Sequence, residues 1–148
     1  MMKQEKIIVY ADGGARGNPG PAGIGVFIER GNRPIGKYAE NIGVRTNNEA
    51  EYEAVIFALK KLKHLFGKQK TRDLEVEVRM DSELVARQLS GKYKITEKRF
   101  YPLFIKIWNL KMDFGNISFV EIPREKNREA DRLLNEELDR ATAQSKLI

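Results

Sequence analysis

The chain has 148 residues, no cysteine and one histidine, and its 27 Lys and Arg against 21 Asp and Glu give a net charge of +6. This composition excludes a disulfide scaffold, a thiolate zinc site, a cysteine nucleophile and a histidine-rich metal cage. The length fits a single domain over residues 1–148, and the charge indicates a polyanionic partner. No apolar run is long enough to cross a membrane and no signal sequence is evident, so we expect a cytoplasmic monomer without a membrane partner.

Hydrophobic periodicity, glycines and capping signals predict an α/β domain with the element order βββ-α-β-αα-β-α. In chain order we expect strands at 7–11, 22–30 and 35–43, a helix from Thr46 to about Phe66, a strand at 74–80, helices at 82–89 and 101–114, a strand at 117–122, and a helix at 127–142. The glycine-rich residues 13–23 are interpreted as a loop. Short connections make the first three strands antiparallel, and helical crossovers make the last two parallel to the first, so the sheet is mixed.

Four carboxylates stand where packing alone does not favour them. Asp12 ends the first strand, and Asp81 ends the strand at 74–80. Glu51 lies in the middle of the apolar face of the long helix, and Asp131 lies within the last helix. A buried carboxylate is costly unless it is paired or binds a metal. Local interpretations stay open, namely a turn former for Asp12, a helix cap for Asp81 and an extended, partly solvated side chain for Glu51.

Together the four carboxylates indicate one site. The first and fourth strands are expected to be adjacent and parallel, so Asp12 and Asp81 should converge beyond the strand ends, where open sheets collect ligands. Glu51 and Asp131 come from helices that can reach the same end. A site made only of carboxylate oxygens suits a hard cation such as Mg²⁺ or Mn²⁺.

Four segments, in the same order as in the family, resemble the signatures of type 1 ribonuclease H. They are YADGGARGNPGPAG at 10–23, TNNEAEY at 46–52, MDSELV at 80–85 and NREAD at 127–131. The best-known bacterial members carry a basic, tryptophan-rich protrusion, whereas the matching residues 88–95 are shorter here and look more like the archaeal and plant-type branch. Those members also carry a histidine in the loop before the last aspartate, where this chain offers Arg124.

The resemblance implies a ribonuclease H-like fold, with a five-stranded mixed sheet of three antiparallel and then two parallel strands flanked by helices. It implies an endonuclease that hydrolyses the RNA strand of RNA–DNA hybrids and leaves 5′-phosphate and 3′-hydroxyl ends. Two Mg²⁺ ions, with Mn²⁺ as a substitute, would be held by four catalytic carboxylates and assisted by Arg124. In the family pattern Asp12 bridges both ions, Glu51 and Asp81 bind one, and Asp131 binds the other.

The same resemblance implies that several polar side chains contact the substrate. Those expected at the RNA strand are Asn18, Thr46, Asn47 and Asn48, and those expected at the DNA strand are Lys92, Tyr93 and Lys94. A second basic stretch at 60–72 is a weaker candidate for the DNA contact. Trp108 is expected in the core rather than at a stacking surface. Cleavage of double-stranded RNA stays open.

Two other functions also fit the sequence. A different metal-dependent nuclease of the same fold, such as an integrase or a junction resolvase, would use the same carboxylates. A hybrid-binding module without catalysis would lack one of them, and all four are present. Asn18 and the run at 46–48 favour the ribonuclease.

Overall fold

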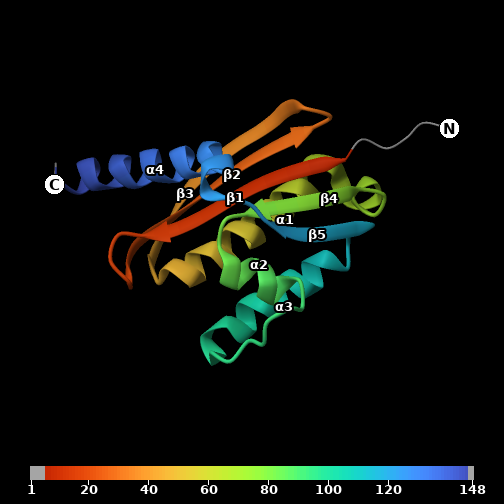
Figure 1. Cartoon of the computed structure of the whole chain (residues 1–148). Coiled ribbons are helices and arrows are strands. Elements are labelled where there is room, and N and C mark those ends of the chain that lie inside the picture. The colour runs from red at the N-terminus through yellow and green to blue at the C-terminus, as the bar shows by residue number, and fades with distance from the viewer. Residues whose placement is uncertain (1–5, 147–148) are drawn as a thin grey trace.

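The computed structural model describes residues 6–146, which form a five-stranded mixed sheet with helices on both faces (Figure 1). The strands are β1 (Ile7–Ala15), β2 (Gly20–Arg30), β3 (Arg33–Arg45), β4 (Glu75–Met80) and β5 (Asn116–Glu121). Their order in the sheet is β3-β2-β1-β4-β5, with β2 antiparallel to β1 and β3, and with β4 parallel to β1 and β5. The predicted topology is therefore confirmed.

The helices divide between the two faces of the sheet. They are α1 (Asn47–Thr71), α2 (Glu83–Leu89), α3 (Tyr101–Lys111) and α4 (Arg128–Lys146), with short 3₁₀ turns η1 (Lys98–Phe100) and η2 (Arg124–Lys126). Helix α4 packs on β1, β2 and β3 from one side, whereas α1 packs on β1 and β2 from the other and contacts α3 (Figure 1). None of the helices within residues 6–146 has the length and apolar character needed to cross a bilayer.

The glycine-rich segment is a hairpin of two long strands rather than the loop that we predicted. Gly13 lies inside β1, and a Cβ there would stand 2.1 Å from the carbonyl oxygen of Ala50 in α1. Gly25 in β2 is as close to Ala130 in α4. These glycines let helices approach both faces of the sheet, so here they mark helix packing and not a break in the strand.

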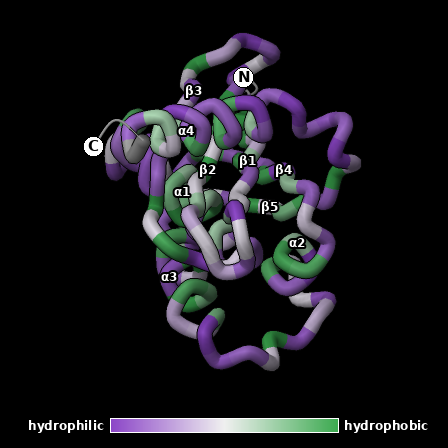
Figure 2. Tube along the Cα trace, turned by 90° about the vertical axis from the view of Figure 1, so that its left-hand side faces the viewer, coloured by the Kyte–Doolittle hydropathy of each residue, from purple (hydrophilic) through white to green (hydrophobic). Residues whose placement is uncertain are grey.

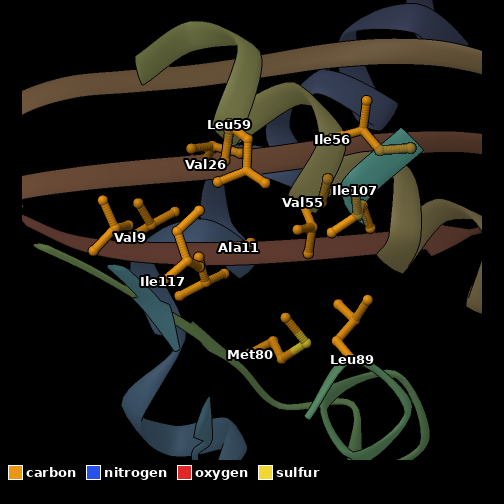
Figure 3. Close-up of a cluster of buried hydrophobic side chains, with 14 of the residues drawn as sticks. Val9, Ala11, Val26, Val55, Ile56, Leu59, Met80, Leu89, Ile107 and Ile117 are labelled. Carbon is orange, nitrogen blue, oxygen red and sulfur yellow. The ribbon is translucent and has the colours of Figure 1, made fainter. Parts of the chain in front are cut away.

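The core lies between the sheet and α1. Val9, Ala11 and Val26 from the sheet pack with Val55 and Leu59 from α1, and all five are buried (Figure 3). In Figure 2 the outer loops are mainly hydrophilic, and hydrophobic segments gather where the strands and helices meet. Burial of these side chains, at about 25 cal/mol per Å² of apolar surface, fixes α1 and therefore the start of that helix.

The face of α3 that packs on the core differs from the one that we predicted. Ile107 is its buried residue, whereas the side chain of Trp108 is 53% exposed and stacks on Phe104 at a centroid distance of 6.4 Å. The expectation that Trp108 belongs to the core is therefore wrong. Because adjacent residues on a helix point about 100° apart, the face that packs Ile107 against α1 turns Trp108 outward.

Candidate functional site

The site lies where the pairing between β1 and β4 ends. Strand β4 pairs with β1 only as far as Arg79, which lies opposite Tyr10, while β1 continues along β2. Asp12 and Asp81 follow that last pair by two residues each, so both stand at the open end between β1 and β4. Ser82, and not Asp81, caps α2, because the Ser82 hydroxyl accepts a hydrogen bond from the Val85 amide at 3.2 Å.

Glu51 reaches this point from α1. The capping box is confirmed, since Thr46 Oγ1 accepts from the Glu49 amide and Glu49 accepts from the Thr46 amide. This start of the helix, together with the close contact at Gly13, sets Glu51 against β1 with only 8% of the residue exposed. One carboxylate oxygen from each of Asp12, Glu51 and Asp81 lies within 4.8 Å of the others.

Asp131 joins the site from the first turn of α4. Asn127, just before the helix, is fully buried and donates from Nδ2 to the carbonyl oxygen of Ala11 at 3.0 Å, which ties the helix start to β1 next to Asp12. Asp12, Glu51, Asp81 and Asp131 all line one cleft of about 410 Å³. All four predicted carboxylates therefore meet in one place.

The electrostatics of the cleft are unfavourable for four negative charges. Burial, and next the charge of Asp81, raises the pKa of Asp12 to about 7. Burial and the neighbouring Asp12 raise the pKa of Glu51 well above its usual value, and burial raises that of Asp81 although Arg124 opposes this shift. Carboxylates held this close favour either a shared proton or a bound cation.

The donor set fits a hard divalent cation. Every charged ligand is a carboxylate oxygen, which is the donor that Mg²⁺ and Mn²⁺ prefer. Among the described residues, Glu51 Oε2 is buried and has no hydrogen-bond partner. A buried acceptor without a partner is costly, and a cation at this point would satisfy it.

Arg124 lies at the edge of the same cleft, on η2. Its Nε is 3.8 Å from Asp81 Oδ2, and 88% of its side chain is exposed. Such a contact is a weak ion pair because solvent screens it. The predicted residue is therefore beside the carboxylates, but it is not held there tightly.

Comparison with known proteins assigns the chain to a family. The model of the reverse transcriptase-like family matches residues 10–137. The crystal structure of LC11-RNase H1 in complex with an RNA/DNA hybrid, from a protein isolated from compost by a metagenomic approach, superposes with a TM-score of 0.88 at 53% identity. That match covers 93% of this chain and 99% of the other. The chain belongs to the type 1 ribonuclease H family.

Two further relatives of this ribonuclease H domain come from an archaeon and a bacterium. Ribonuclease HI of Halobacterium salinarum is 36% identical over 137 residues, covering 92% of this chain and 66% of the relative, and the crystal structure of its RNase H1 gives a TM-score of 0.82. The bifunctional protein Rv2228c of Mycobacterium tuberculosis is 37% identical over 142 residues. This chain spans only 37% of the length of that protein, and the solved structure of its N-terminal RNase H domain gives a TM-score of 0.84.

The side chains predicted to contact RNA lie around the hairpin and the start of α1 in this ribonuclease H domain. Asn18 Oδ1 accepts from the Asn47 amide at 2.9 Å, and Asn47 Oδ1 accepts from the Ala15 amide at 2.8 Å. Asn47 and Asn48 line the cleft, and Thr46 caps the helix. The structure thus shows the local role of these residues, and their contact with substrate stays a prediction.

The residues predicted to contact DNA lie outside the cleft, in the segment after α2. The Tyr93 hydroxyl donates to Glu83 Oε1 at 2.6 Å and accepts from Arg87 Nη1 at 2.9 Å. Lys92, Tyr93 and Lys94 are all exposed. They form a separate basic surface that only an extended ligand could contact together with the carboxylates.

Sequence reasoning missed Arg16, Asn135 and Asp139. Asn135 donates from Nδ2 to Asp131 Oδ1 at 3.1 Å, and Arg16 donates from Nη2 to Asp139 Oδ1 at 2.6 Å. For Asn135 and Asp139 the signal in the sequence is a spacing of four residues from Asp131, which places three polar side chains on one helix face. For Arg16 the signal is its place in the segment at 10–23 that resembles the family signature.

Proposed function

We propose that this chain hydrolyses the RNA strand of RNA–DNA hybrids, leaving 5′-phosphate and 3′-hydroxyl ends, with two Mg²⁺ ions that Mn²⁺ can replace. The observation that carries the proposal is the convergence of Asp12, Glu51 and Asp81 within 4.8 Å, in a cleft that Asp131 also lines. The 53% identity to an RNase H1 that was crystallised with an RNA/DNA hybrid supports the choice of substrate.

The carboxylates would hold the cations. Asp12 would contribute to both ions, Glu51 and Asp81 to one, and Asp131 to the other. When bound, a pair of divalent cations activates water and stabilises the leaving oxygen. The chain keeps Glu51 and Asp12 almost fully buried, so these carboxylates are fixed before the substrate arrives and lose little freedom on binding.

Arg124 would act by charge. A guanidinium stays protonated at working pH, so it cannot serve as a general base. Its exposed position beside Asp81 leaves its N–H groups free to contact the phosphate that is being cleaved or released. We therefore assign Arg124 an electrostatic role in turnover.

Asn18, Asn47 and Asn48 would distinguish RNA from DNA. The 2′-hydroxyl is the group that separates the two sugars, and it both donates and accepts hydrogen bonds. Asn18 and Asn47 use their side-chain oxygens within the protein, so their Nδ2 groups are the donors that can face a 2′-hydroxyl. Thr46 would contact a neighbouring phosphate at the same helix start.

Lys92, Tyr93 and Lys94 would contact the DNA strand. Their exposure and positive charge suit a phosphate backbone, which supplies most of the sequence-independent affinity for nucleic acids. The monomeric state, the cytoplasmic location and the single domain over residues 1–148 stay predictions, and cleavage of double-stranded RNA stays open.

The test is a substrate panel. Labelled RNA–DNA hybrid, duplex RNA and duplex DNA are incubated with the protein in Mg²⁺, in Mn²⁺ and in excess chelator. We expect the hybrid to be cut in its RNA strand, with metal only, and duplex DNA to stay intact.

Asp12→Asn should abolish cleavage but retain hybrid binding, because it removes a charge and little volume. Asp73→Asn, at an exposed turn, is the matched control and should cut normally.

Different results would indicate the other two functions. Cleavage of duplex DNA would assign the chain to another nuclease class of the same fold. Hybrid binding without cleavage under any metal condition would make it a binding module. Cleavage that persists in excess chelator would overturn the metal mechanism.

A further inference from the structure

Arg16 is a cationic side chain at the cleft that has no part in the function proposed above. Among the described residues that line the cleft, only Arg16 and Arg124 are positively charged. Arg16 lies in the turn between β1 and β2, and its amide donates to the carbonyl oxygen of Pro21 at 2.8 Å. Its backbone is therefore fixed by the hairpin, while 41% of its side chain is exposed.

Helix α4 holds the guanidinium in place. Arg16 Nη2 donates to Asp139 Oδ1 at 2.6 Å and is 3.4 Å from the carbonyl oxygen of Asn135. The side chain of Asn135 in turn donates to Asp131 Oδ1 at 3.1 Å and to the Asp131 carbonyl oxygen at 2.9 Å. A chain of contacts thus connects Arg16 to the metal-binding carboxylate of α4 and sets its position relative to that carboxylate.

The contacts with α4 leave most of the guanidinium available. Both use Nη2, whereas a guanidinium carries five N–H donors in one plane. The Nε–H group and both Nη1–H groups make neither contact, so they stay available to donate to phosphate oxygens. The floor of the cleft is acidic and repels phosphates other than one bound through cations, so an extended polyanion needs cationic groups at the edge.

We propose that Arg16 binds a backbone phosphate of the nucleic acid at the edge of the cleft, with Asp139 and Asn135 holding its guanidinium in position. The proposal rests on the proposed function and adds a substrate contact on the α4 side, away from Lys92 and Lys94. The alternative is that Arg16 serves only to bridge the hairpin and α4.

The test compares Arg16→Ala with Arg132→Ala. Arg132 lies on α4, pairs with Glu129 and Glu136, has a 47% exposed side chain and does not line the cleft, so its loss controls for the change in net charge. Hybrid affinity is measured between about 50 and 200 mM salt in the Asp12→Asn background, where no cleavage interferes. We expect Arg16→Ala to weaken binding about tenfold at the lowest salt and to reduce the salt slope by about 1. Arg132→Ala should leave the slope unchanged.

A third variant separates charge from geometry. Arg16→Lys keeps the charge, but a flexible ammonium cannot pair with Asp139 and also present fixed donors to a phosphate, so it should keep the salt slope and recover only part of the affinity. A lower melting temperature for Arg16→Ala with a wild-type salt slope would show a bridge only and overturn the proposal. If wild-type protein cuts hybrid and Arg16→Ala has an unchanged salt slope, the proposed phosphate contact of Arg16 is rejected and the proposed function stands. If wild-type protein does not cut hybrid, the proposed function fails, whatever the slope shows.

Discussion

The carboxylate cleft and the connection between α2 and α3 (residues 90–100) place their charged side chains in opposite environments, one buried and one exposed to solvent. In the cleft, Asp12 and Glu51 are almost fully buried, and burial together with the charge of a neighbouring aspartate, Asp81 for Asp12 and Asp12 for Glu51, raises their pKa values. In the connection, Lys92 and Lys94 are exposed and bear no comparable cost. The negative groups are thus concentrated at a site where burial disfavours their charge, whereas the positive groups of the connection are spread over the solvent-exposed surface.

A buried hydrogen-bond chain joins the two regions. Tyr52, the residue after Glu51, donates from its hydroxyl to Gln88 Oε1 at 2.5 Å. Gln88 then donates from Nε2 to the carbonyl oxygen of Lys94 at 3.3 Å. The exposed connection is therefore anchored one residue away from the carboxylate Glu51 of the cleft, and its position depends on the core.

The largest expected effect is the response of the cleft to pH and metal. The pKa of Asp12 is raised from 3.8 to about 7, so at pH 5 the folded chain holds a proton that the unfolded chain has lost. Stability without metal should therefore fall as pH rises, by about 3 kcal/mol from pH 5 to pH 8 for this group alone. Denaturant unfolding with chelator, and again with excess Mg²⁺, measures this change.

Mg²⁺ and Asp12→Asn should each reduce the loss of folding stability between pH 5 and pH 8. The cation binds only the arrangement of carboxylates that the folded chain provides, and the amide removes the titrating group. Substitution of an exposed residue of the connection, such as Lys94→Ala, should leave the pH dependence unchanged. Stability that is flat or rises between pH 5 and pH 8 in chelator would contradict a cleft with buried, repelling carboxylates.

This contrast also explains which parts of the site the sequence could predict. In the sequence pattern Asp12 and Asp81 directly follow the apolar residues of two strands, and Glu51 interrupts an apolar helix face, so a burial conflict was visible in the pattern itself. The strand order followed from short connections and helical crossovers. Local sequence signals and global topology agree at these carboxylates, which is why their convergence could be predicted.

Contacts between distant elements could not be predicted in the same way. The glycines at 13–23 have the composition of a loop, whereas in the structure Gly13 packs against α1 and Gly23 packs against α4 within two strands of a hairpin. Trp108 and Ile107 are both apolar, so composition alone does not say which of them faces the core. The contact of Arg16 with Asp139 joins residues 123 positions apart and depends on the hairpin reaching α4.

Tyr52→Phe removes the hydrogen bond to Gln88 that connects the cleft to the connection between α2 and α3. This variant keeps the ring tilted against Phe100, at a centroid distance of 5.2 Å, but leaves the buried oxygen of Gln88 without its donor. Burial raises the pKa of Tyr52, so the hydroxyl is protonated and donates under all working conditions. We expect a loss of about 2 kcal/mol in the free energy of unfolding, measured with denaturant. A neutral result would show that the connection does not depend on this anchor.

Arg124→Ala tests the exposed edge of the cleft. An 88% exposed guanidinium contributes less than a buried one, so we expect kcat to fall about tenfold with a smaller rise in KM. Arg124→Lys should recover part of kcat because the charge remains. Arg128→Ala, an exposed residue at the start of α4 that does not line the cleft, is the matched control. Wild-type kinetics for Arg124→Ala would make this arginine an ordinary surface residue.

The smallest effect is expected in the connection itself. Replacing Lys92 and Lys94 together by alanine removes two exposed charges and no buried contact of a side chain. We expect KM for the hybrid to rise about fivefold and kcat to stay the same, since exposed charges each contribute up to about 1 kcal/mol. The salt slope of hybrid binding should fall by about 2, because two phosphate contacts are lost.

The matched control for this pair is Lys68→Ala with Lys70→Ala, which removes the same charge from the other basic stretch at 60–72. Both lysines are exposed beyond the break of α1 at Gly67, so the two double variants differ mainly in location. If net charge alone attracts the substrate, the two pairs should weaken binding equally. If the connection contacts the DNA strand, only the pair at 92 and 94 should lower the salt slope. A larger loss for the pair at 68 and 70 would move the DNA contact to the end of α1 and leave the connection without a role in binding.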